Sequence, residues 1–512
     1  MNMVTNPADK ICSLDELGQR CQGLREAGKT VVQCHGTFDL LHPGHLRHLQ
    51  RARQEGEALV VTITADTYVN KGPGRPVFPQ HLRAESLASL TSVDYVAIIH
   101  DATALPAIQQ VRPAVYVKGQ DYKQAEEDLT GNIVHEQRAV ELHGGRLHFT
   151  EEIVFSSSKL INEYLDIYPP ATRAYLGEFK KKWSAQFLID ALGELKDLKV
   201  LVVGEAIIDE YCYTTPMGMT GKGGNIIATR YNDRELFAGG SLAIANHLSG
   251  FVSEVGLLAG LGTQCPHEPF IRQQLEENVD PHFIHYADAP TLLKRRYVDE
   301  TTKLFEIYHY NPEPLTPEVD EAFTAWIREH APGYDLVIVP DYGNGLISPN
   351  MVDALCESAP FLAVNTQINS GNRGYHVITR YKRADFVSLN EPEVRLAAHN
   401  RRDPLEQVAE SIGKRVNAKQ MSITMGPHGA MMLDLDGGEV MQVPALATQV
   451  VDIIGAGDAF LTMAALAAKA GFPAEVGAFL GSTAAALDLQ IVCNRSFVQP
   501  EGLFKFITSL LK

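Results

Sequence analysis

The sequence predicts a protein of two α/β domains with parallel sheets, and three observations lead to this fold class. The chain has 512 residues, more than the roughly 100–200 residues of one ordinary domain. Apolar residues make up 45% and charged residues 21%, which is typical of a globular protein. Short apolar runs alternate with helix-like stretches in both halves, and parallel strands need such crossovers.

The first 165 residues contain a regular alternation of predicted strands and helices. Apolar runs at 30–34, 58–64, 94–99 and 114–117 are the predicted strands, and 46–54, 80–91 and 103–111 are the predicted helices. The run at 58–64 is apolar almost throughout, as in strands that are buried on both faces of a sheet. We therefore expect a three-layer α/β domain of Rossmann type over residues 1–165.

The composition changes after this domain, where Tyr168-Pro169-Pro170 interrupts a Lys-containing helical stretch. We expect a helical linker at 166–197 with a hinge at the prolines, and a second α/β domain at 198–512. The predicted strands of that domain include 199–204, 336–339, 361–364, 386–389 and 421–424.

The net charge and the number and spacing of the cysteines exclude several classes of protein. The chain carries 45 Lys and Arg against 62 Asp and Glu, a net charge of −17, which argues against binding nucleic acid or an anionic membrane. Seven scattered cysteines without a CxxC pair indicate a reducing compartment, and the start of the sequence does not resemble a signal peptide. The apolar stretch at 460–492 is too interrupted to span a membrane. We expect a cytoplasmic protein.

A first candidate site follows the first predicted strand, where open α/β sheets bind ligands. The stretch Gly36–His45 reads GTFDLLHPGH and leads into a helix. Free amides at a helix N-terminus suit phosphate, and Gly36, Thr37 and Phe38 are predicted to form a nucleotide cradle. His42 and His45 lie on one face of a helical turn, from which they can donate hydrogen bonds to a triphosphate.

This stretch resembles the HxGH signature of cytidylyltransferase-like nucleotidyltransferases, and further matches extend over about 28–165. The resemblance implies that Lys71 lies over the transferred group and that Lys118 and Gly119 line the base or phosphate pocket. It also implies that Ser156, Ser157 and Ser158 cap a helix and donate to the nucleotide phosphates, although a plain helix cap explains them too. Asp39 is catalytic or orients the turn, and Arg83 reaches phosphate or pairs with an acidic neighbour.

A second candidate site lies near the C-terminus, where Gly455, Ala456 and Gly457 precede Asp458 and a helix of small residues. Three small residues leave backbone amides open at a helix N-terminus, which forms an anion hole for a developing phosphoryl charge. The carboxylate of Asp458 is placed to accept a proton from an attacking hydroxyl.

The decapeptide at 451–460 resembles the Asp-Thr-x-Gly-Ala-Gly-Asp signature of the PfkB/ribokinase carbohydrate-kinase family, and further matches extend over 199–512. The resemblance implies a ribokinase-like α/β/α fold, ATP and Mg²⁺. It implies that Glu393 acts on the metal through water. The implied ATP-site residues are Asn390, Thr424, Gly426 and Gly429, and the implied sugar-site residues are Asp209, Gly239, Gly240 and Asn246. The basic cluster 294–296 is either a docking point for a sugar phosphate or a solvated strand edge.

Both halves together resemble the bifunctional heptose-7-phosphate kinases/heptose-1-phosphate adenylyltransferases of ADP-heptose synthesis, with the order of the domains reversed. Asn365-Thr366-Gln367 replaces the Asp-Pro of that family, and 215–224 replaces its Pro-rich stretch, which leaves the sugar open. Gly36-Thr37-Phe38 favours CTP as nucleotidyl donor, whereas Lys118–Tyr122 favours ATP. The resemblance also implies a homo-oligomer, since kinases of this family often dimerise through a small sheet. Two alternatives to a bifunctional enzyme are that one domain has lost its catalytic activity, or that the protein is a nucleotide-sensing binding protein.

Overall fold

The computed structural model describes residues 6–69, 75–119, 132–150, 168–220, 226–265, 267–372 and 374–512. The chain divides into two compact units. The first unit comprises Met1–Pro169 with Phe504–Lys512, and the second comprises Pro170–Leu503. In the described part of the chain, no helix combines the length and the apolar character needed to cross a membrane.

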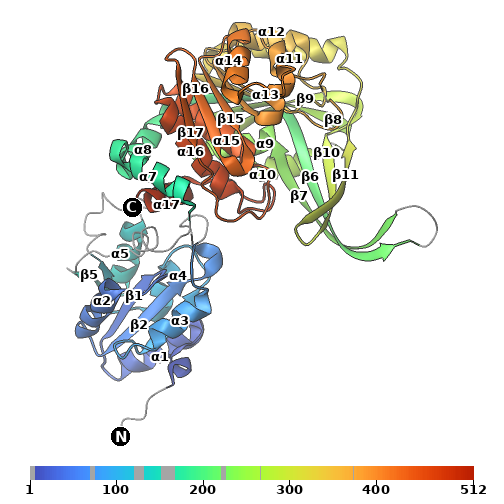
Figure 1. Ribbon diagram of the computed structural model, residues 1–512. Helices are drawn as coiled ribbons and strands as arrows, with labels where there is room; N and C mark the ends of the chain where they lie inside the picture. Colours follow the sequence, from blue (N-terminus) through green and yellow to red (C-terminus); the bar gives the residue numbers. More distant parts are fainter. Residues whose placement is uncertain are drawn as a thin grey trace. The chain divides into compact units, whose positions relative to one another are not determined.

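The N-terminal unit is built on a five-stranded parallel sheet with the strand order β3-β2-β1-β4-β5 (Figure 1). Its strands are β1 (Val31–Gly36), β2 (Ala58–Thr64), β3 (Tyr95–Ile99), β4 (Val115–Gly119) and β5 (Arg146–Thr150). Its helices are α1 (Leu14–Glu26), α2 (Pro43–Gln54), α3 (Gln80–Ala88), α4 (Leu105–Val111) and α5 (Asn132–Leu142). The predicted Rossmann-type class is confirmed.

Residues on the two faces of β1 pack into opposite layers of this unit. Val31 packs into the cluster that contains residues of α1 and α4, whereas Val32 and Cys34 pack into the cluster that contains residues of α2 and α3. Both clusters are apolar, which explains why β1 and β2 read as nearly continuous apolar runs. The sequence analysis did not predict β5, because its residues alternate between polar and apolar types instead of forming such a run.

The second unit contains one unusually long strand, β6 (Lys199–Met219), which joins two parts of its sheet. The first part of β6 lies between the parallel strands β8 and β12. The second part pairs with β7 and β10 in a smaller sheet that also contains β11. The other strands are β7 (Ile227–Gly240), β8 (Glu254–Gln264), β9 (Val279–Pro290), β10 (Leu293–Asp299), β11 (Thr302–His309), β12 (Leu336–Asp341), β13 (Leu362–Thr366), β14 (Phe386–Asn390), β15 (Gln420–Thr424), β16 (Ala430–Asp434) and β17 (Glu439–Val443).

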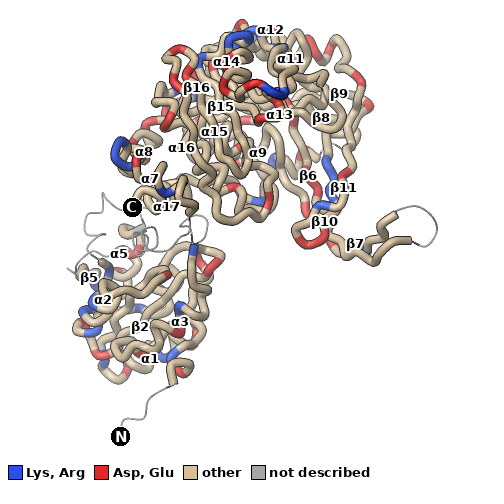
Figure 2. The backbone as a smooth tube through the Cα atoms, in the orientation of Figure 1, with Lys and Arg blue, Asp and Glu red and all other residues tan. Residues whose placement is uncertain are grey.

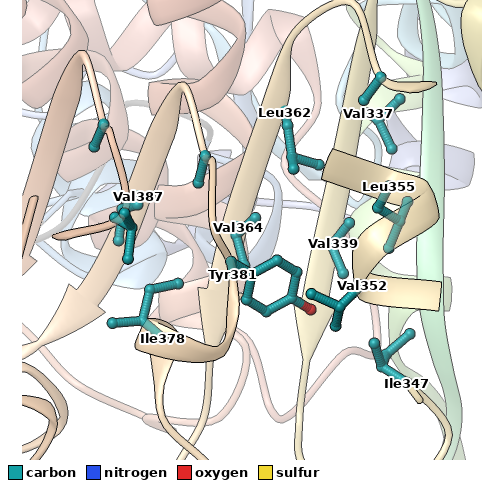
Figure 3. Close-up of a cluster of buried hydrophobic side chains, with 14 of the residues drawn as sticks. Val337, Val339, Ile347, Val352, Leu355, Leu362, Val364, Ile378, Tyr381 and Val387 are labelled. Atoms are coloured by element: carbon teal, nitrogen blue, oxygen red, sulfur yellow. The ribbon is translucent and has the colours of Figure 1, made fainter. Parts of the chain in front are cut away.

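Helices cover both faces of the main sheet of this unit. Its helices are α7 (Pro170–Lys182), α8 (Ala185–Gly193), α9 (Ser241–Ser249), α10 (Glu268–Gln274), α11 (Pro317–His330), α12 (Pro349–Ser358), α13 (Glu391–Ala397), α14 (Leu405–Arg415), α15 (Ala456–Lys469) and α16 (Ala474–Asp488), and α17 (Pro500–Leu511) follows. Buried residues of α11–α14 pack against β12–β15 in a large apolar cluster, part of which is drawn in Figure 3. Helices α9, α15 and α16 cover the other face, which gives the predicted α/β/α layering.

The first part of β6 and the strands β12, β14 and β15 are parallel, so their carboxyl ends meet at the same edge of this main sheet. Side chains that follow the strands are therefore brought together at this edge, together with the start of α15. The smaller sheet branches from the continuation of β6. This arrangement positions the second candidate site.

Candidate active sites

In the N-terminal unit, the predicted histidine pair lies at the start of α2. His42 is the N-cap residue, and its Nδ1 accepts a hydrogen bond from the backbone N–H of His45 at 3.4 Å. The two imidazole rings are stacked, with centroids 3.9 Å apart. Nδ1 of His45 lies 3.2 Å from the carbonyl oxygen of Leu40, a contact that orients the second ring. Burial lowers the pKa of His42, so this ring is neutral at neutral pH and donates through one nitrogen.

The predicted nucleotide cradle precedes these histidines. Phe38 has a positive φ of 48°, and its ring centroid lies 5.1 Å from that of His45. A Cβ on Gly36 would come within 3.3 Å of the Phe38 ring, so glycine allows the ring to fold back over the end of β1. The carbonyl oxygen of Thr37 accepts a hydrogen bond of 2.6 Å from the guanidinium of Arg83. The structure thus brings the three cradle residues next to the histidine pair.

Two further polar residues hold this turn in place. Asp39 is buried and accepts hydrogen bonds from the backbone N–H groups of Val77 (2.7 Å) and Phe78 (3.2 Å), and it also pairs with Arg75. Arg83 is buried and donates to three carbonyl oxygens and to Asp66, so it pairs with an acidic neighbour. Of the two roles considered for each residue, this geometry supports the structural one.

Lys118 and Gly119 form the end of β4, next to β1 in the sheet. The ammonium of Lys118 lies 2.8 Å from a carboxylate oxygen of the buried residue Glu136 and above the ring of Tyr116. The glutamate partner could not be predicted from the sequence, because it comes from α5. The other predicted residues of this site, Lys71, Ser156, Ser157 and Ser158, lie outside the described residues.

In the second unit, Gly455, Ala456 and Gly457 form the start of α15, as predicted. Gly455 is the N-cap residue with a φ of 103°, a conformation that side chains other than hydrogen rarely allow. In the described part of the chain, the N–H groups of Ala456 and Gly457 have no acceptor, since they belong to the first turn of the helix. These amides and the positive end of the helix dipole form an anion site.

Asp458 lies in the same first turn of α15, and its side chain is partly buried. One carboxylate oxygen accepts a hydrogen bond of 2.9 Å from the hydroxyl of Tyr342. Burial raises the pKa of Asp458 from 3.8 to about 7, and the charge of Asp209 adds to this rise, whereas the hydrogen bond from Tyr342 and the charge of Lys294 oppose it. A carboxylate with a pKa near neutrality is well suited to accept a proton.

A buried carboxyl group that the sequence analysis missed lies beneath this turn. Asp488, at the end of α16, is fully buried, and neither of its carboxyl oxygens has a hydrogen-bond partner among the described residues. A Cβ on Gly455 would approach Asp488 Oδ2 to 2.6 Å and Asn494 Oδ1 to 2.8 Å. Burial raises the pKa of Asp488 well above its ordinary value, which keeps the group uncharged next to the anion site. No local pattern in the sequence marks this residue.

The predicted ATP-site residues Asn390 and Thr424 stand opposite each other at the ends of β14 and β15. Asn390 and Glu393 form a capping box at the start of α13, with reciprocal hydrogen bonds of 2.8 Å. Gly426 and Gly429 bound the short turn after β15, both with positive φ. A Cβ on Gly429 would come within 2.0 Å of a backbone oxygen, so this tight turn requires glycine.

The buried carboxyl group of Glu393 was predicted to act on Mg²⁺ through water. Its two oxygens accept hydrogen bonds from the backbone of Asn390 (2.8 Å) and Ile368 (3.3 Å). Burial raises the pKa of Glu393 to about 7, and the charge of Asp458 contributes to this rise. Among the described residues, no group of three His, Cys, Asp or Glu side chains can enclose a metal ion. This donor set fits an ion that keeps waters and substrate phosphates as its main ligands.

Three predicted sugar-site residues lie together where the main sheet meets the smaller sheet. Asp209 is buried on β6 and forms an ion pair with Arg296 of β10. A Cβ on Gly239 would lie 2.0 Å from an oxygen of Asp209, so glycine is required there for the strands to approach. Gly240, with a φ of 62°, begins α9.

Asn246, the fourth predicted sugar-site residue, lies further along α9. Its side-chain amide donates to the carbonyl oxygen of Gln274 at 2.8 Å, and its amide oxygen accepts from the N–H of Glu276 at 3.2 Å. The structure therefore gives Asn246 a connecting role between α9 and the segment after α10, and it does not bring its polar atoms to Asp209.

The basic cluster expected before a strand lies within strand β10, where Figure 2 shows basic residues beside acidic ones. Arg295 pairs with Glu210, and Arg296 pairs with Asp209 and Glu306. Lys294 is buried, and its ammonium lies over the rings of Tyr308 and Tyr342 at 5.2 and 5.8 Å. In the described part of the chain, Lys294 forms no ion pair, which distinguishes it from the two arginines.

The fold and these sites define the class of protein: a ribokinase-like α/β/α unit linked to a Rossmann-type unit with a nucleotidyltransferase-like turn. The family model described as pfkB family carbohydrate kinase matches residues 197–492, more than half of the chain, so the protein belongs to the pfkB carbohydrate-kinase family. The model described as cytidylyltransferase-like matches residues 33–163. The recognition of both halves from their motifs is confirmed.

Curated relatives share parts of this chain. The bifunctional protein HldE of Methylobacillus flagellatus is 44% identical over 117 residues, which are 22% of this chain and 24% of the relative. The HldE protein of Trichlorobacter lovleyi is 25% identical over 297 residues, 57% of this chain and 59% of the relative. The aligned part is thus less than two thirds of the length of these relatives.

Solved structures support the fold of the second unit. Phosphofructokinase-2 from Escherichia coli, in complex with potassium, superposes with a TM-score of 0.51 at 14% identity. The match covers 62% of this chain and 100% of that protein. At this identity the likeness concerns the fold alone.

Proposed function

We propose that this protein is a bifunctional enzyme of nucleotide-sugar synthesis. The second unit phosphorylates a hydroxyl of a heptose-like sugar or sugar phosphate with ATP. The N-terminal unit transfers a nucleotidyl group from ATP to a sugar 1-phosphate and releases pyrophosphate, which gives an ADP-heptose-like product. The names of the bifunctional relatives and the matches to two enzyme families support this proposal.

The observation that carries the kinase activity is the position of Asp458 in the first turn of α15, next to the open amides of Ala456 and Gly457. Asp458 takes the proton of the sugar hydroxyl, the oxygen attacks the γ-phosphorus of ATP, and ADP leaves. The amides of residues 455–457 stabilise the negative charge that develops on the transferred group. Thr424, Gly426 and Gly429 bound the nucleotide site, and Asp209, Gly239 and Gly240 belong to the sugar side.

Glu393 would hold Mg²⁺ through water, together with the phosphates of the nucleotide, and the ion would supply neutralisation of phosphate charge. Asn390 fixes the carboxylate of Glu393 through the capping box, so these two residues keep the metal-facing group in one position. Lys294, which is buried without a carboxylate partner among the described residues, faces either a phosphate on the sugar or the phosphoryl group in transfer.

In the nucleotidyl transfer, an oxygen of the sugar phosphate attacks the α-phosphorus and pyrophosphate leaves. This nucleophile is already anionic, so the reaction needs positioning and charge stabilisation more than a base. His42 and His45 donate hydrogen bonds to the triphosphate, and Gly36, Thr37 and Phe38 hold the nucleotide. Lys71, Lys118, Gly119 and Ser156–Ser158 complete the site, as the family resemblance implies.

CTP is the alternative donor, and one observation favours it: the matching family model is described as cytidylyltransferase-like, and Gly36-Thr37-Phe38 is similar to enzymes of that kind. The product would then be a CDP-linked sugar or alditol. A catalytically silent, regulatory domain is a further alternative. Competition between ATP and CTP in the pyrophosphate-release assay separates the two donors.

We further propose that the protein forms a homodimer through the smaller sheet. The hairpin of β6 and β7 extends away from the body of its unit (Figure 1) and exposes Met217, Ile226 and Tyr231, each more than half accessible to solvent. Such apolar side chains on an exposed strand pair favour association with another chain. The division into 1–165, 166–197 and 198–512 and the cytoplasmic location remain predictions.

Two assays on the full chain test the proposal: ATP-dependent phosphorylation of heptose and heptose phosphate, and NTP-dependent release of pyrophosphate. Asp458→Asn should reduce the first rate by about 1,000-fold and leave the second unchanged. His45→Ala should reduce the second rate by about 100-fold and leave the first unchanged. Undiminished phosphorylation by Asp458→Asn would refute the kinase mechanism, and undiminished pyrophosphate release by His45→Ala would refute the transferase mechanism.

A further inference from the structure

Tyr342, the residue after β12, connects the end of the main sheet to Asp458. Its hydroxyl donates a hydrogen bond of 2.9 Å to Asp458 Oδ1. The side chain of Tyr342 is 4% exposed and packs with Ile207 and Leu292 in a small apolar cluster. The hydrogen bond to the carboxylate therefore comes from a buried side chain.

The backbone of Tyr342 is fixed on both sides of its side chain. Its N–H donates to the buried carboxylate of Glu205 at 3.0 Å, and the N–H of Asn344 donates to the other oxygen of the same carboxylate at 2.8 Å. Its carbonyl oxygen accepts a hydrogen bond from the side chain of Asn369 at 2.9 Å and a weaker one from Asn372 at 3.4 Å. Tyr342 is thus held by polar groups from β6 and from the loop after β13.

That loop follows Asn365-Thr366-Gln367, the stretch in which this chain departs from the Asp-Pro of the heptose-kinase pattern. The side chain of Asn372 donates to the carbonyl oxygens of Gly343 and Gln367, both at 3.1 Å, and accepts from the N–H of Asn369 at 3.0 Å. A Cβ on Gly343 would lie 2.0 Å from the same amide nitrogen, so the loop and the turn after Tyr342 are in close contact. Asn369 and Asn372, which the sequence analysis did not single out, therefore immobilise the tyrosine.

We propose that Tyr342 is a positioning residue for Asp458, and that the loop of Asn369 and Asn372 acts on the reaction by holding Tyr342. The inference rests on the proposed function, in which Asp458 is the base. One hydrogen bond to Oδ1 fixes the carboxylate rotamer and leaves Oδ2 to accept the proton of the sugar hydroxyl. Among the described residues, Tyr342 is the one side chain that hydrogen-bonds to this carboxylate.

The hydrogen bond also favours the charged form of the base. Burial raises the pKa of Asp458 to about 7, and the bond from Tyr342 opposes this rise. Loss of the hydroxyl therefore has two separable effects: the carboxylate gains rotational freedom, which lowers the rate at every pH, and its pKa rises further, which moves the acid limb of the rate profile to higher pH.

Tyr342→Phe in the full chain tests the inference, and Tyr381→Phe is a matched control. Tyr381 is also buried and also donates a hydrogen bond of 2.9 Å to an aspartate, Asp341, but it does not contact Asp458. Tyr342→Phe should lower kcat for sugar phosphorylation about tenfold with little change in KM, and should move the acid limb of kcat upward in pH. Tyr381→Phe should lower the melting temperature of the protein by about as much as Tyr342→Phe does, but it should not move the acid limb of kcat.

A double variant distinguishes positioning from a general structural effect. If Tyr342 acts through Asp458, adding Tyr342→Phe to Asp458→Asn should cause no further loss of rate. An unshifted acid limb in Tyr342→Phe, or an equal shift in Tyr381→Phe, would overturn the inference while leaving Asp458 as the base. Undiminished phosphorylation by Asp458→Asn overturns the proposed function itself, so the two failures are distinguishable.

Discussion

The two candidate sites use the same backbone device with different chemical groups. In each, a glycine-bearing turn leads into the N-terminus of a helix, α2 in one unit and α15 in the other. The turn before α2 presents two imidazole rings, whereas the first turn of α15 presents a carboxylate with a raised pKa. The comparison teaches that, under the proposed function, the charge of the nucleophile determines which side chains each site needs. An anionic phosphate oxygen needs hydrogen-bond donors around its target, whereas a neutral hydroxyl also needs a base.

The two turns also differ in what holds them. Polar side chains fix the turn before α2: Asp39 binds the segment at 75–78, and Arg83 binds Thr37. The turn before α15 depends on backbone geometry, since Gly455 has a φ of 103° and lies directly over Asp488. Substitutions at the two glycines should therefore have unequal effects.

Of the two glycine substitutions, Gly455→Ala should have the larger effect. The new Cβ would meet Asp488 Oδ2 at 2.6 Å, and the φ of 103° is strained for alanine, so the amides of α15 would move away from the phosphoryl group. We expect the kinase rate to fall about 100-fold with unchanged pyrophosphate release, measured by the two separate assays. A kinase rate within twofold of the parent chain would contradict the requirement for glycine.

Gly36→Ala should have a smaller effect on the other reaction. The new Cβ would meet the ring of Phe38 at 3.3 Å, and a side chain can yield by the few tenths of an ångström required. We expect pyrophosphate release to fall by about tenfold or less, because the cradle shifts slightly. A loss as large as that of Gly455→Ala would show that the two turns depend on glycine to the same extent.

Lys294→Gln tests the buried ammonium of the kinase unit. Arg295→Gln is the control, because Arg295 pairs with Glu210 and adjacent residues of a strand point to opposite faces. Loss of a charged hydrogen bond to phosphate should reduce kcat/KM about tenfold. A rise in KM confined to phosphorylated sugars indicates a sugar-phosphate contact, and an equal loss of kcat with unphosphorylated sugars indicates a contact to the transferred group. Unchanged kinetics with both would exclude Lys294 from substrate binding.

The smallest effect is expected from pH alone. Asp458 must be deprotonated to act as base, and its pKa is raised to about 7, so the kinase rate should be fully present above neutrality and fall as the pH drops below 7. Burial lowers the pKa of His42, so this ring stays neutral to more acidic pH. Pyrophosphate release should therefore persist at pH 6, where phosphorylation declines. Parallel profiles for the two activities would contradict this difference.

The sequence predicted most of the secondary structure that positions these sites. The four strands predicted in the N-terminal unit are β1–β4, with boundaries within two residues, because contiguous apolar runs are a direct consequence of burial on both faces. The prediction from the sequence failed for β5, whose residues alternate in polarity. It also failed for β6, whose continuation beyond residue 204 forms part of a second sheet. Those outcomes depend on which strands are neighbours, and strand neighbours come from distant parts of the chain.

The sequence by itself determined the two turns proposed to bind phosphate and the family, because these depend on glycines, histidines and a carboxylate at fixed local spacings. Only the tertiary structure decided which polar groups are engaged elsewhere: Arg296 with Asp209, Asn246 with the segment after α10, and Tyr342 with Asp458. It also decided that burial raises the pKa of Asp458 to about 7. The physical reason is that ion pairing and desolvation depend on distances between groups far apart in the chain, whereas turn geometry depends on neighbouring residues.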